Sequence, residues 1–201
     1  MGSGGNEPTA ENKTTINGGP GDDTICVCCC NIFCFHCNTI IKVLENNKIL
    51  DKRISQIKEG EQVLTYNGKN KIFSQVIKNI ENKGLFEFFT IKCKNKKSNN
   101  KMISITGNHT MIVYGKIKHE IIFKYANQVQ IGDLFMTSDG LFEVYEIKKE
   151  IMNNSYEMRV ENGTVLANDI LVSTLYLEKI EIKKYHQNII NSIKNKNEIL
   201  N

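Results

Sequence analysis

Three side chains that could together act on a carbonyl group are Cys34, Thr106 and His109. A cysteine thiolate is a strong nucleophile, but a thiol with a pKa of about 8.5 is only a few per cent ionised at neutral pH, so its site must assist it. Thr106 and His109 are three residues apart in "TGNH", between two apolar clusters. A tight turn at a strand end can direct a hydroxyl and an imidazole at the same small volume. These residues are therefore candidates for cysteine-based nucleophilic chemistry.

Composition and charge indicate a soluble domain and argue against a nucleic-acid-binding protein. The chain has 201 residues, of which 40% are hydrophobic and 24% charged, as expected for one soluble domain with tails. The net charge is only +4 and the lysines are interleaved with asparagines, so no element has the dense basic charge of a nucleic-acid-binding protein. No secretory signal is apparent, which leaves the cytoplasm as the default compartment. We expect a monomer without a cofactor.

Short apolar clusters predict the elements that must position these side chains. The clusters are rich in Ile, Val, Phe and Tyr, which favour strands, and turn-forming stretches such as "NGKN", "ENKG" and "SDG" separate most of them. The expected strands lie within residues 39–44, 62–66, 73–80, 85–93, 102–107, 110–115, 120–125, 134–138, 141–150, 155–160 and 164–177. So many short strands with tight turns indicate an all-β domain.

An internal repeat indicates that this domain has two related halves. "QIKEGEQVLTYNG" begins at Gln56, and "QVQIGDLFMTSDG" begins at Gln128, 72 residues further on. Aligned without gaps, the two stretches share a Gln, a Gly, a Thr and the final Gly. Two copies predict pseudo-two-fold symmetry within one domain, since a solenoid needs at least three.

The two ends of the chain differ from this middle part. Residues 1–33 are rich in Gly, Asn and Thr and then in Cys, so we expect a disordered, Cys-rich leading segment. In 176–201 the apolar residues Ile182, Tyr185 and Ile189 are three or four positions apart. This spacing predicts a C-terminal amphipathic helix.

Four stretches, in this order, resemble motifs of the Hint domain, the fold shared by inteins, bacterial intein-like domains and hedgehog autoprocessing domains. "CFHCNTII" from Cys34 is similar to its start, and "ITGNH" is similar to its Thr-x-x-His motif. The repeated turns that begin at Gln56 and Gln128 resemble its paired turns, and "ENGTVLANDILVST" resembles its closing hairpin. The resemblance implies a pseudo-two-fold horseshoe of short antiparallel strands over residues 34–175.

The resemblance also implies an N-to-S acyl shift at the Phe33–Cys34 bond. The Cys34 thiolate would attack the carbonyl of Phe33 and replace the peptide bond with a thioester, so that residues 1–33 form an extein-like leaving segment. His109 would protonate the departing nitrogen, and Thr106 would hydrogen-bond at the scissile peptide. The substrate would be the chain's own flanking polypeptide, and the cleavage would be autocatalytic and single-turnover.

The closing hairpin departs from splicing inteins, which end in His-Asn before a Cys, Ser or Thr. Ser173 and Thr174 stand at the matching positions, and neither can cyclise to a succinimide. Loss of this step implies that an external nucleophile resolves the thioester, as in the hedgehog type. We expect water, a thiol or an amine in preference to a sterol, which would need a longer C-terminal extension. The hedgehog type also uses an acidic residue to activate the cysteine or the acceptor, and Glu81 stands about where it would fall.

Other functions remain open from the sequence. The chain could splice through a non-standard C-terminal junction, for example at Asn168. It could instead be a zinc-binding module, because Cys34, Cys37, Cys30 and His36 could form a tetrahedral set of ligands. Palmitoylation of the leading cysteines could associate the chain with a membrane. A Hint fold retained as an inactive structural module is a further alternative.

Overall fold

The computed structural model describes residues 34–66, 70–116 and 120–174. These residues form one sheet of 12 strands. The strands are β1 (Phe35–His36), β2 (Ile40–Glu45), β3 (Lys48–Arg53), β4 (Gln62–Tyr66), β5 (Lys71–Lys94), β6 (Asn100–Thr106), β7 (Thr110–Gly115), β8 (Glu120–Tyr125), β9 (Leu134–Thr137), β10 (Gly140–Val160), β11 (Thr164–Ala167) and β12 (Ile170–Ser173). Two short 3-10 turns, η1 (Ile54–Gln56) and η2 (Ala126–Gln128), complete the described part.

Every strand pairing in this part of the chain is antiparallel. The prediction of an all-β fold is therefore confirmed. The leading segment 1–33 and the helix expected in 176–201 lie outside the described residues. In the described residues, no helix has the length and apolar character needed to cross a bilayer.

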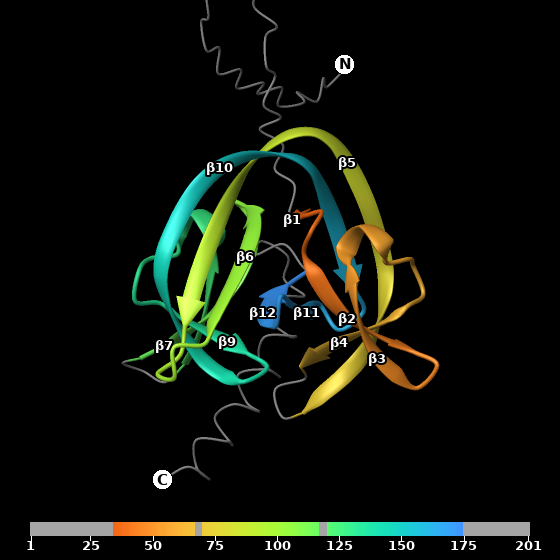
Figure 1. The fold of residues 1–201 in the computed structure, drawn as a ribbon, viewed down its shortest axis with the longest axis horizontal. Coiled ribbons are helices and arrows are strands. Elements are labelled where there is room, and N and C mark those ends of the chain that lie inside the picture. The colour runs from red at the N-terminus through yellow and green to blue at the C-terminus, as the bar shows by residue number, and fades with distance from the viewer. Residues whose placement is uncertain (1–33, 67–69, 117–119, 175–201) are drawn as a thin grey trace, which may run out of the picture.

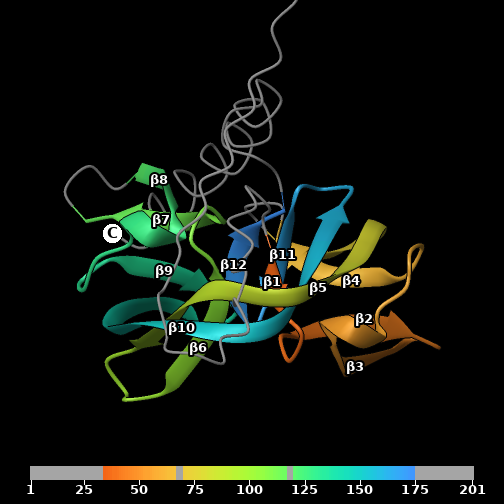
Figure 2. The ribbon, with the colours of Figure 1, turned by 90° about the horizontal axis from the view of Figure 1, so that it is seen from above.

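Two long strands give the molecule its horseshoe shape. β5 and β10 run antiparallel to one another and arch over both halves of the molecule (Figure 1). Seen from above, β2, β3 and β4 lie at one end of this arch and β7, β8 and β9 at the other, with the β11–β12 hairpin between them (Figure 2). The hairpin joins the halves, because Ala167 pairs with Ile41 of β2 and Val172 pairs with Met111 of β7.

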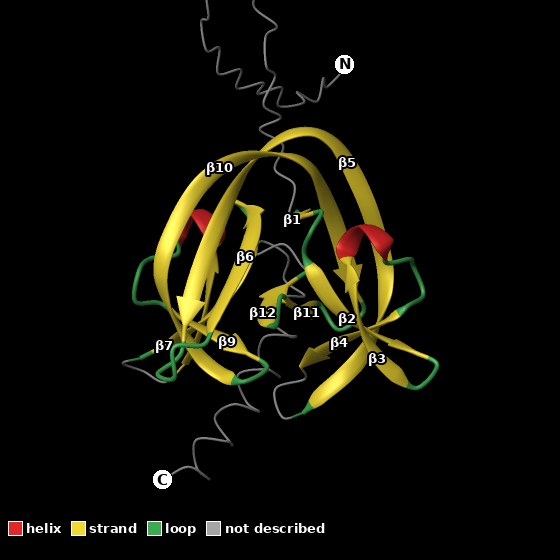
Figure 3. Cartoon of the chain, in the orientation of Figure 1, coloured by secondary structure: helices red, strands yellow, loops and turns green. Residues whose placement is uncertain are grey.

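The same turn is built once in each half, where η1 and η2 occupy corresponding places (Figure 3). Gly60 and Gly132 follow these turns with φ values of +89° and +91°, a region that favours glycine. Each glycine N–H donates to a long strand over 2.8 Å, to the carbonyl of Val76 in one half and of Val144 in the other. This is the structural reason that the repeat retains both glycines.

The ion pairs of the two halves also correspond. Lys52 binds Glu61 over 2.8 Å, and Lys124 binds Asp133 over 2.8 Å. Lys124 stands 72 positions after Lys52, and Asp133 stands 72 positions after Glu61. This is the separation of the two copies of the repeat. The predicted pseudo-two-fold symmetry is confirmed.

Two details of the predicted strands are wrong. "ENKG" (81–84) is not a turn, since these residues lie within β5, and 141–150 and 155–160 likewise belong to one strand, β10. The partner strand supplies hydrogen bonds along this stretch, with a bulge at Asn154, and so overrides the local preference for a turn. β3 was not expected, because nearly all of its side chains are exposed and its two apolar residues, Ile49 and Leu50, are adjacent and do not alternate with polar ones.

The core lies on both faces of the central hairpin. Val165 and Ala167 belong to the main apolar cluster, whereas Leu166 belongs to a second one. A strand buried on both faces reads as a continuous apolar run, as "TVLA" does. The hairpin is thus fixed from both sides, which holds its final residues beside the turn after β6.

Candidate active site

Cys34 and Thr106 are joined by two reciprocal hydrogen bonds. The backbone N–H of Cys34 donates to Oγ1 of Thr106 over 3.0 Å, and the backbone N–H of Thr106 donates to the carbonyl of Cys34 over 3.0 Å. Cys34 is fully buried directly before β1, whose Phe35 pairs with Ile105 of β6 on one side and Tyr156 of β10 on the other. The hydroxyl expected at the scissile peptide is therefore bonded to the nitrogen of that peptide.

His109 is fully buried beside this pair. Its Nε2 lies 2.9 Å from the carbonyl oxygen of Ser173, and its ring meets the Phe35 ring edge-on with centroids 4.4 Å apart. Because a carbonyl oxygen only accepts, Nε2 carries the hydrogen of this bond. Burial lowers the pKa of His109 to about 4, although the nearby backbone groups of Ser173 and Cys34 act in the opposite direction. The ring is therefore neutral at pH 7, with the lone pair on Nδ1.

The turn that carries Thr106 and His109 is fixed by η2 and by a close contact. Ala126 N–H donates to the His109 carbonyl, and Asn127 N–H donates to the Gly107 carbonyl, each over 2.8 Å. A Cβ at position 107 would lie 2.8 Å from the ring of Phe89. Gly107 is thus needed for packing, and it holds the turn against β5.

The other half has the same turn with the residue types exchanged. There, Thr39 N–H donates to the His36 carbonyl over 2.9 Å, just as His109 N–H donates to the Thr106 carbonyl over 3.0 Å. η1 then binds the carbonyl of Thr39, as η2 binds that of His109. The pseudo-two-fold thus relates "HCNT" to "TGNH", and only the second copy places its imidazole in the buried interior.

The thiol of Cys34 has a contact that sequence reasoning missed. Nδ2 of the half-buried Asn82, in β5, donates to Sγ of Cys34 over 3.4 Å. The neighbouring Glu81 is exposed, and its carboxylate accepts a hydrogen bond from Asn154 over 3.2 Å. Glu81 also raises the pKa of Tyr156, second to burial. Glu81 was expected to help activate the cysteine or the acceptor. The side chain that contacts the thiol is instead that of Asn82, the next residue along β5.

The closing hairpin contributes backbone groups to the site. Ser173 and Thr174 are both buried, and the Ser173 carbonyl is the one that accepts from His109. The Thr174 N–H donates to the Gly163 carbonyl over 2.9 Å, and its hydroxyl accepts from Val160 N–H over 3.3 Å. The structure thus brings Cys34, Thr106, His109 and Ser173 together and places Thr174 just beyond them. Phe33 lies outside the described residues.

The candidate zinc ligands do not form a cluster in the described part of the chain. Sγ of Cys37 lies 3.6 Å from Nε2 of His36, whose ring packs edge-on against Phe88. No group of three or more His, Cys, Asp or Glu side chains suited to a metal occurs in residues 34–66, 70–116 and 120–174. Cys30 lies outside these ranges.

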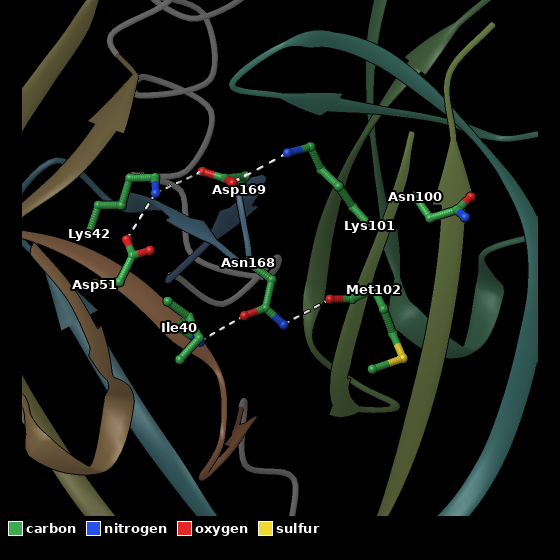
Figure 4. A pocket seen from close by; sticks show the side chains of 8 residues that line it. All are labelled: Ile40, Lys42, Asp51, Asn100, Lys101, Met102, Asn168 and Asp169. Carbon is green, nitrogen blue, oxygen red and sulfur yellow. Dashed lines mark hydrogen bonds and ion pairs between the residues drawn. The ribbon is translucent and has the colours of Figure 1, made fainter. Parts of the chain in front are cut away.

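A pocket of about 290 Å³ between β2 and β6 surrounds Asn168 (Figure 4). The carboxamide of Asn168 accepts from Ile40 N–H over 2.7 Å and donates to the Met102 carbonyl over 2.8 Å. The adjacent Asp169 carboxylate lies between the ammonium groups of Lys42 and Lys101, at 3.8 and 3.3 Å. Asn168 therefore links the two halves through its side chain, in a turn where its φ is +48°.

These groups are of the chemical types that acyl transfer at a cysteine requires. A thiol lies beside an amide donor, the nitrogen of the same residue is bonded to a hydroxyl, and a neutral imidazole is buried nearby. A neutral imidazole can accept a proton in one step and donate it in the next, so one side chain can act first as the general base and then as the general acid. The thiol precedes β1, the amide donor lies in β5, and the hydroxyl and imidazole lie at the end of β6 and in the turn after it, so the fold is what assembles these groups.

Comparisons with known proteins point to one fold. No protein-family model matches the chain, and no curated protein sequence matches it. Solved structures do match. The gp41-1 intein has a TM-score of 0.54 and 17% identity, over 70% of this chain and 98% of that one. A bacterial intein-like domain from Clostridium thermocellum has a TM-score of 0.55 and 22% identity, over 70% and 97% of the two chains.

An intein from a hyperthermophile has a TM-score of 0.60 and 14% identity, with 70% of this chain and 99% of that one covered. The identities are low, so the likeness concerns architecture. It agrees with the two halves, the arch of β5 and β10 and the central hairpin described above. The chain has the Hint-type fold of inteins and intein-like domains.

Proposed function

We propose that this protein is a self-cleaving processing domain that performs an N-to-S acyl shift at the Phe33–Cys34 bond. The observation that supports this most strongly is the hydrogen bond from the Cys34 nitrogen to the Thr106 hydroxyl, beside the buried neutral His109. Residues 34–175 are the processing domain in this proposal, acting as a monomer. Its substrate is its own flanking polypeptide, so each molecule reacts once.

In the first step the thiol of Cys34 becomes a nucleophile. Nδ1 of neutral His109 takes the thiol proton, and the N–H of Asn82 stabilises the thiolate because it donates to sulfur. Sulfur then attacks the carbonyl carbon of Phe33. A carbon–sulfur bond forms, and the electron pair of the carbonyl moves onto its oxygen.

In the second step this tetrahedral intermediate collapses. The oxyanion reforms the carbonyl, and the bond between its carbon and the nitrogen of Cys34 breaks. Imidazolium at His109 returns the proton to the departing nitrogen, which becomes a free amine. Thr106 holds that nitrogen throughout, and the Ser173 carbonyl, which accepts from Nε2, fixes the tautomer in which Nδ1 is the basic nitrogen.

An external nucleophile then resolves the thioester. A thiol, an amine or water would attack the same carbonyl carbon and release residues 1–33, while Cys34 leaves as a thiolate. A thiol is an effective acceptor, because its thiolate is a strong nucleophile. Ser173 and Thr174 cannot cyclise to a succinimide. The side chains of Asn168 and Asp169 are both engaged, Asn168 in hydrogen bonds to Ile40 and Met102 and Asp169 in an ion pair with Lys101. Cleavage without splicing is the outcome that these contacts favour.

The test is intact mass spectrometry of the purified chain with and without dithiothreitol. Wild type should lose residues 1–33 in a thiol-dependent reaction. Cys34→Ala should remain whole, whereas Cys37→Ser should cleave like wild type, because it changes a neighbouring thiol outside the reaction. A chain that stays intact, or a Cys34→Ala variant that still cleaves, would exclude the proposal.

A further inference from the structure

Ser155 is a fully buried residue whose hydroxyl has no hydrogen-bond partner among the described residues. Buried polar groups are normally paired, because each loses its hydrogen bonds to water when it is covered. A buried hydroxyl without a partner in the described part of the chain therefore requires an explanation. One explanation is that its partner exists only during a reaction.

The strand register places Ser155 next to the proposed reaction. β10 lies between β1 and β5 here, and Ser155 pairs with His36 on one side and with Asn82 on the other. Side chains of directly paired residues lie on the same face of a sheet. Asn82 reaches the sulfur of Cys34 from this face, so Ser155 shares the face that carries the thiol contact.

His36 does not satisfy the hydroxyl. Its Nδ1 accepts from the backbone N–H of Asn38 over 3.4 Å, and its Nε2 lies 3.6 Å from Sγ of Cys37. Both ring nitrogens are thus engaged elsewhere. The hydroxyl of Ser155 is therefore available as a donor on the thiol side of the site.

We propose that Asn82 and Ser155 are the oxyanion donors of the acyl shift, an inference that rests on the function proposed above. Thr106 and His109 act at the nitrogen of the scissile peptide, so the oxygen of its carbonyl needs donors from another side. In the intermediate that oxygen is attached to the carbon that sulfur attacks, two bonds from Sγ. A donor that lies 3.4 Å from Sγ in the resting state is within reach of it.

The electronic change explains the unpaired hydroxyl. When the carbon–sulfur bond forms, a full negative charge develops on an oxygen that was a neutral carbonyl. The amide of Asn82 then donates its N–H to this oxygen and no longer to sulfur, because sulfur is neutral once its electron pair forms the new bond. Ser155 gains its hydrogen bond at the same moment. An interaction made only in the transition state lowers the barrier without stabilising the resting peptide.

The decisive variant is Ser155→Ala, measured for both cleavage rate and melting temperature. The rate of dithiothreitol-dependent release should fall by about 100-fold, the usual effect of losing one oxyanion donor. The melting temperature should stay the same or rise, because the lost hydroxyl was unpaired in the fold. A structural role for Ser155 predicts the reverse pattern, with lower stability and an unchanged rate.

Ser74→Ala is the matched control, because Ser74 is also buried in a strand but its hydroxyl accepts from the Asn162 N–H over 2.9 Å. It should lower the melting temperature and leave the cleavage rate of the folded protein unchanged. A similar loss of rate in both variants would overturn the inference, because it would show that any buried hydroxyl has this effect.

Variants of Asn82 test the other donor. Asn82→Leu should slow cleavage and shift its pH profile to higher pH, since the thiolate loses its donor. Asn82→Asp should be slower still at pH 7, because a carboxylate accepts and repels the thiolate. A faster Asp variant would instead mean that an acid–base group is required there, and would overturn the inference.

The outcomes separate this inference from the function on which it rests. If wild type does not cleave, the proposed function fails and the oxyanion donors fail with it. If wild type cleaves in a Cys34-dependent reaction but Ser155→Ala cleaves at the wild-type rate, only the inference about Ser155 is wrong.

Discussion

The nitrogen of Cys34 donates to the hydroxyl of Thr106 over 3.0 Å, while the nitrogen of Thr106 donates to the carbonyl of Cys34 over the same distance. The two residues are 72 positions apart in the chain. This reciprocal pair closes β1 onto the end of β6 and fixes the nitrogen that must leave in the proposed reaction. The hydroxyl and the backbone of Thr106 therefore have separable roles.

Replacing Thr106 distinguishes these roles. Thr106→Ala removes the hydroxyl and retains the backbone bond, so thiol-dependent cleavage should slow by about 100-fold while the protein stays folded. Thr106→Ser retains the hydroxyl and should cleave at a rate close to that of wild type. The measurement is the rate of appearance of the 34–201 product by intact mass. Equal rates for the Ala and Ser variants would contradict a role for this hydroxyl.

The buried His109 should make stability depend on pH. Its pKa is lowered to about 4 in the fold, from 6.5 in the unfolded chain. Below pH 6.5 the unfolded chain binds a proton that the folded protein does not, so stability is lost as the pH falls from 6.5 to 4. The loss should reach about 3 kcal/mol near pH 4, where it levels off. Urea unfolding of Cys34→Ala, which should not cleave, measures it.

The control for this measurement is Cys34→Ala combined with His109→Gln. The Gln side chain can still donate to the Ser173 carbonyl, but it does not titrate. Carboxylates contribute equally to both proteins, so the difference between the two pH curves isolates His109. Parallel curves between pH 4 and 6.5 would mean that the imidazole is not buried in its neutral form.

Gly107 should position the catalytic turn. A methyl group there would lie 2.8 Å from Cε2 of Phe89, so Gly107→Ala should displace Thr106 and His109 and slow cleavage by about 10-fold to 100-fold. Gly107→Ala combined with Phe89→Leu gives the methyl group space and should recover much of the rate. Phe89→Leu alone serves as the reference. If the double variant is no faster than Gly107→Ala, the ring contact is not the cause.

Asn168 should support stability and have no part in the chemistry. Its side chain makes two hydrogen bonds between the halves, so Asn168→Gly should cost about 2 kcal/mol in urea unfolding, while glycine keeps the positive φ favourable. Cleavage of the folded variant should be unchanged. C-terminal cleavage that occurs in wild type and is absent in Asn168→Gly would instead indicate that the chain splices through this residue.

The sequence predicted the parts of the fold that leave a local pattern. β4, β7 and β8 have the bounds expected from their apolar clusters, and the repeat identified the two equivalent turns. β3 was missed because an exposed edge strand has no apolar alternation to detect. "ENKG" was misread as a turn because its pairing with β10 depends on residues about 70 positions away, which local preference does not encode.

The same limit applies to the site. Cys34, Thr106 and His109 could be proposed from the sequence because their types and motif order carry information. The proposed donors Asn82 and Ser155 could not, since Asn and Ser are common polar residues and only the register of β10 against β1 and β5 brings these two side by side. The one available signal was position, because Asn82 directly follows the acidic residue for which a role was expected.

The most direct test of the central claim is to trap the thioester with hydroxylamine at neutral pH. Wild type should release residues 1–33 with a hydroxamate on the carbonyl of Phe33, and the partner product should begin with a free Cys34 amine. Cys34→Ala should give neither product. An absent fragment, a fragment that ends at another residue, or the same fragment from Cys34→Ala would contradict an acyl shift at this bond.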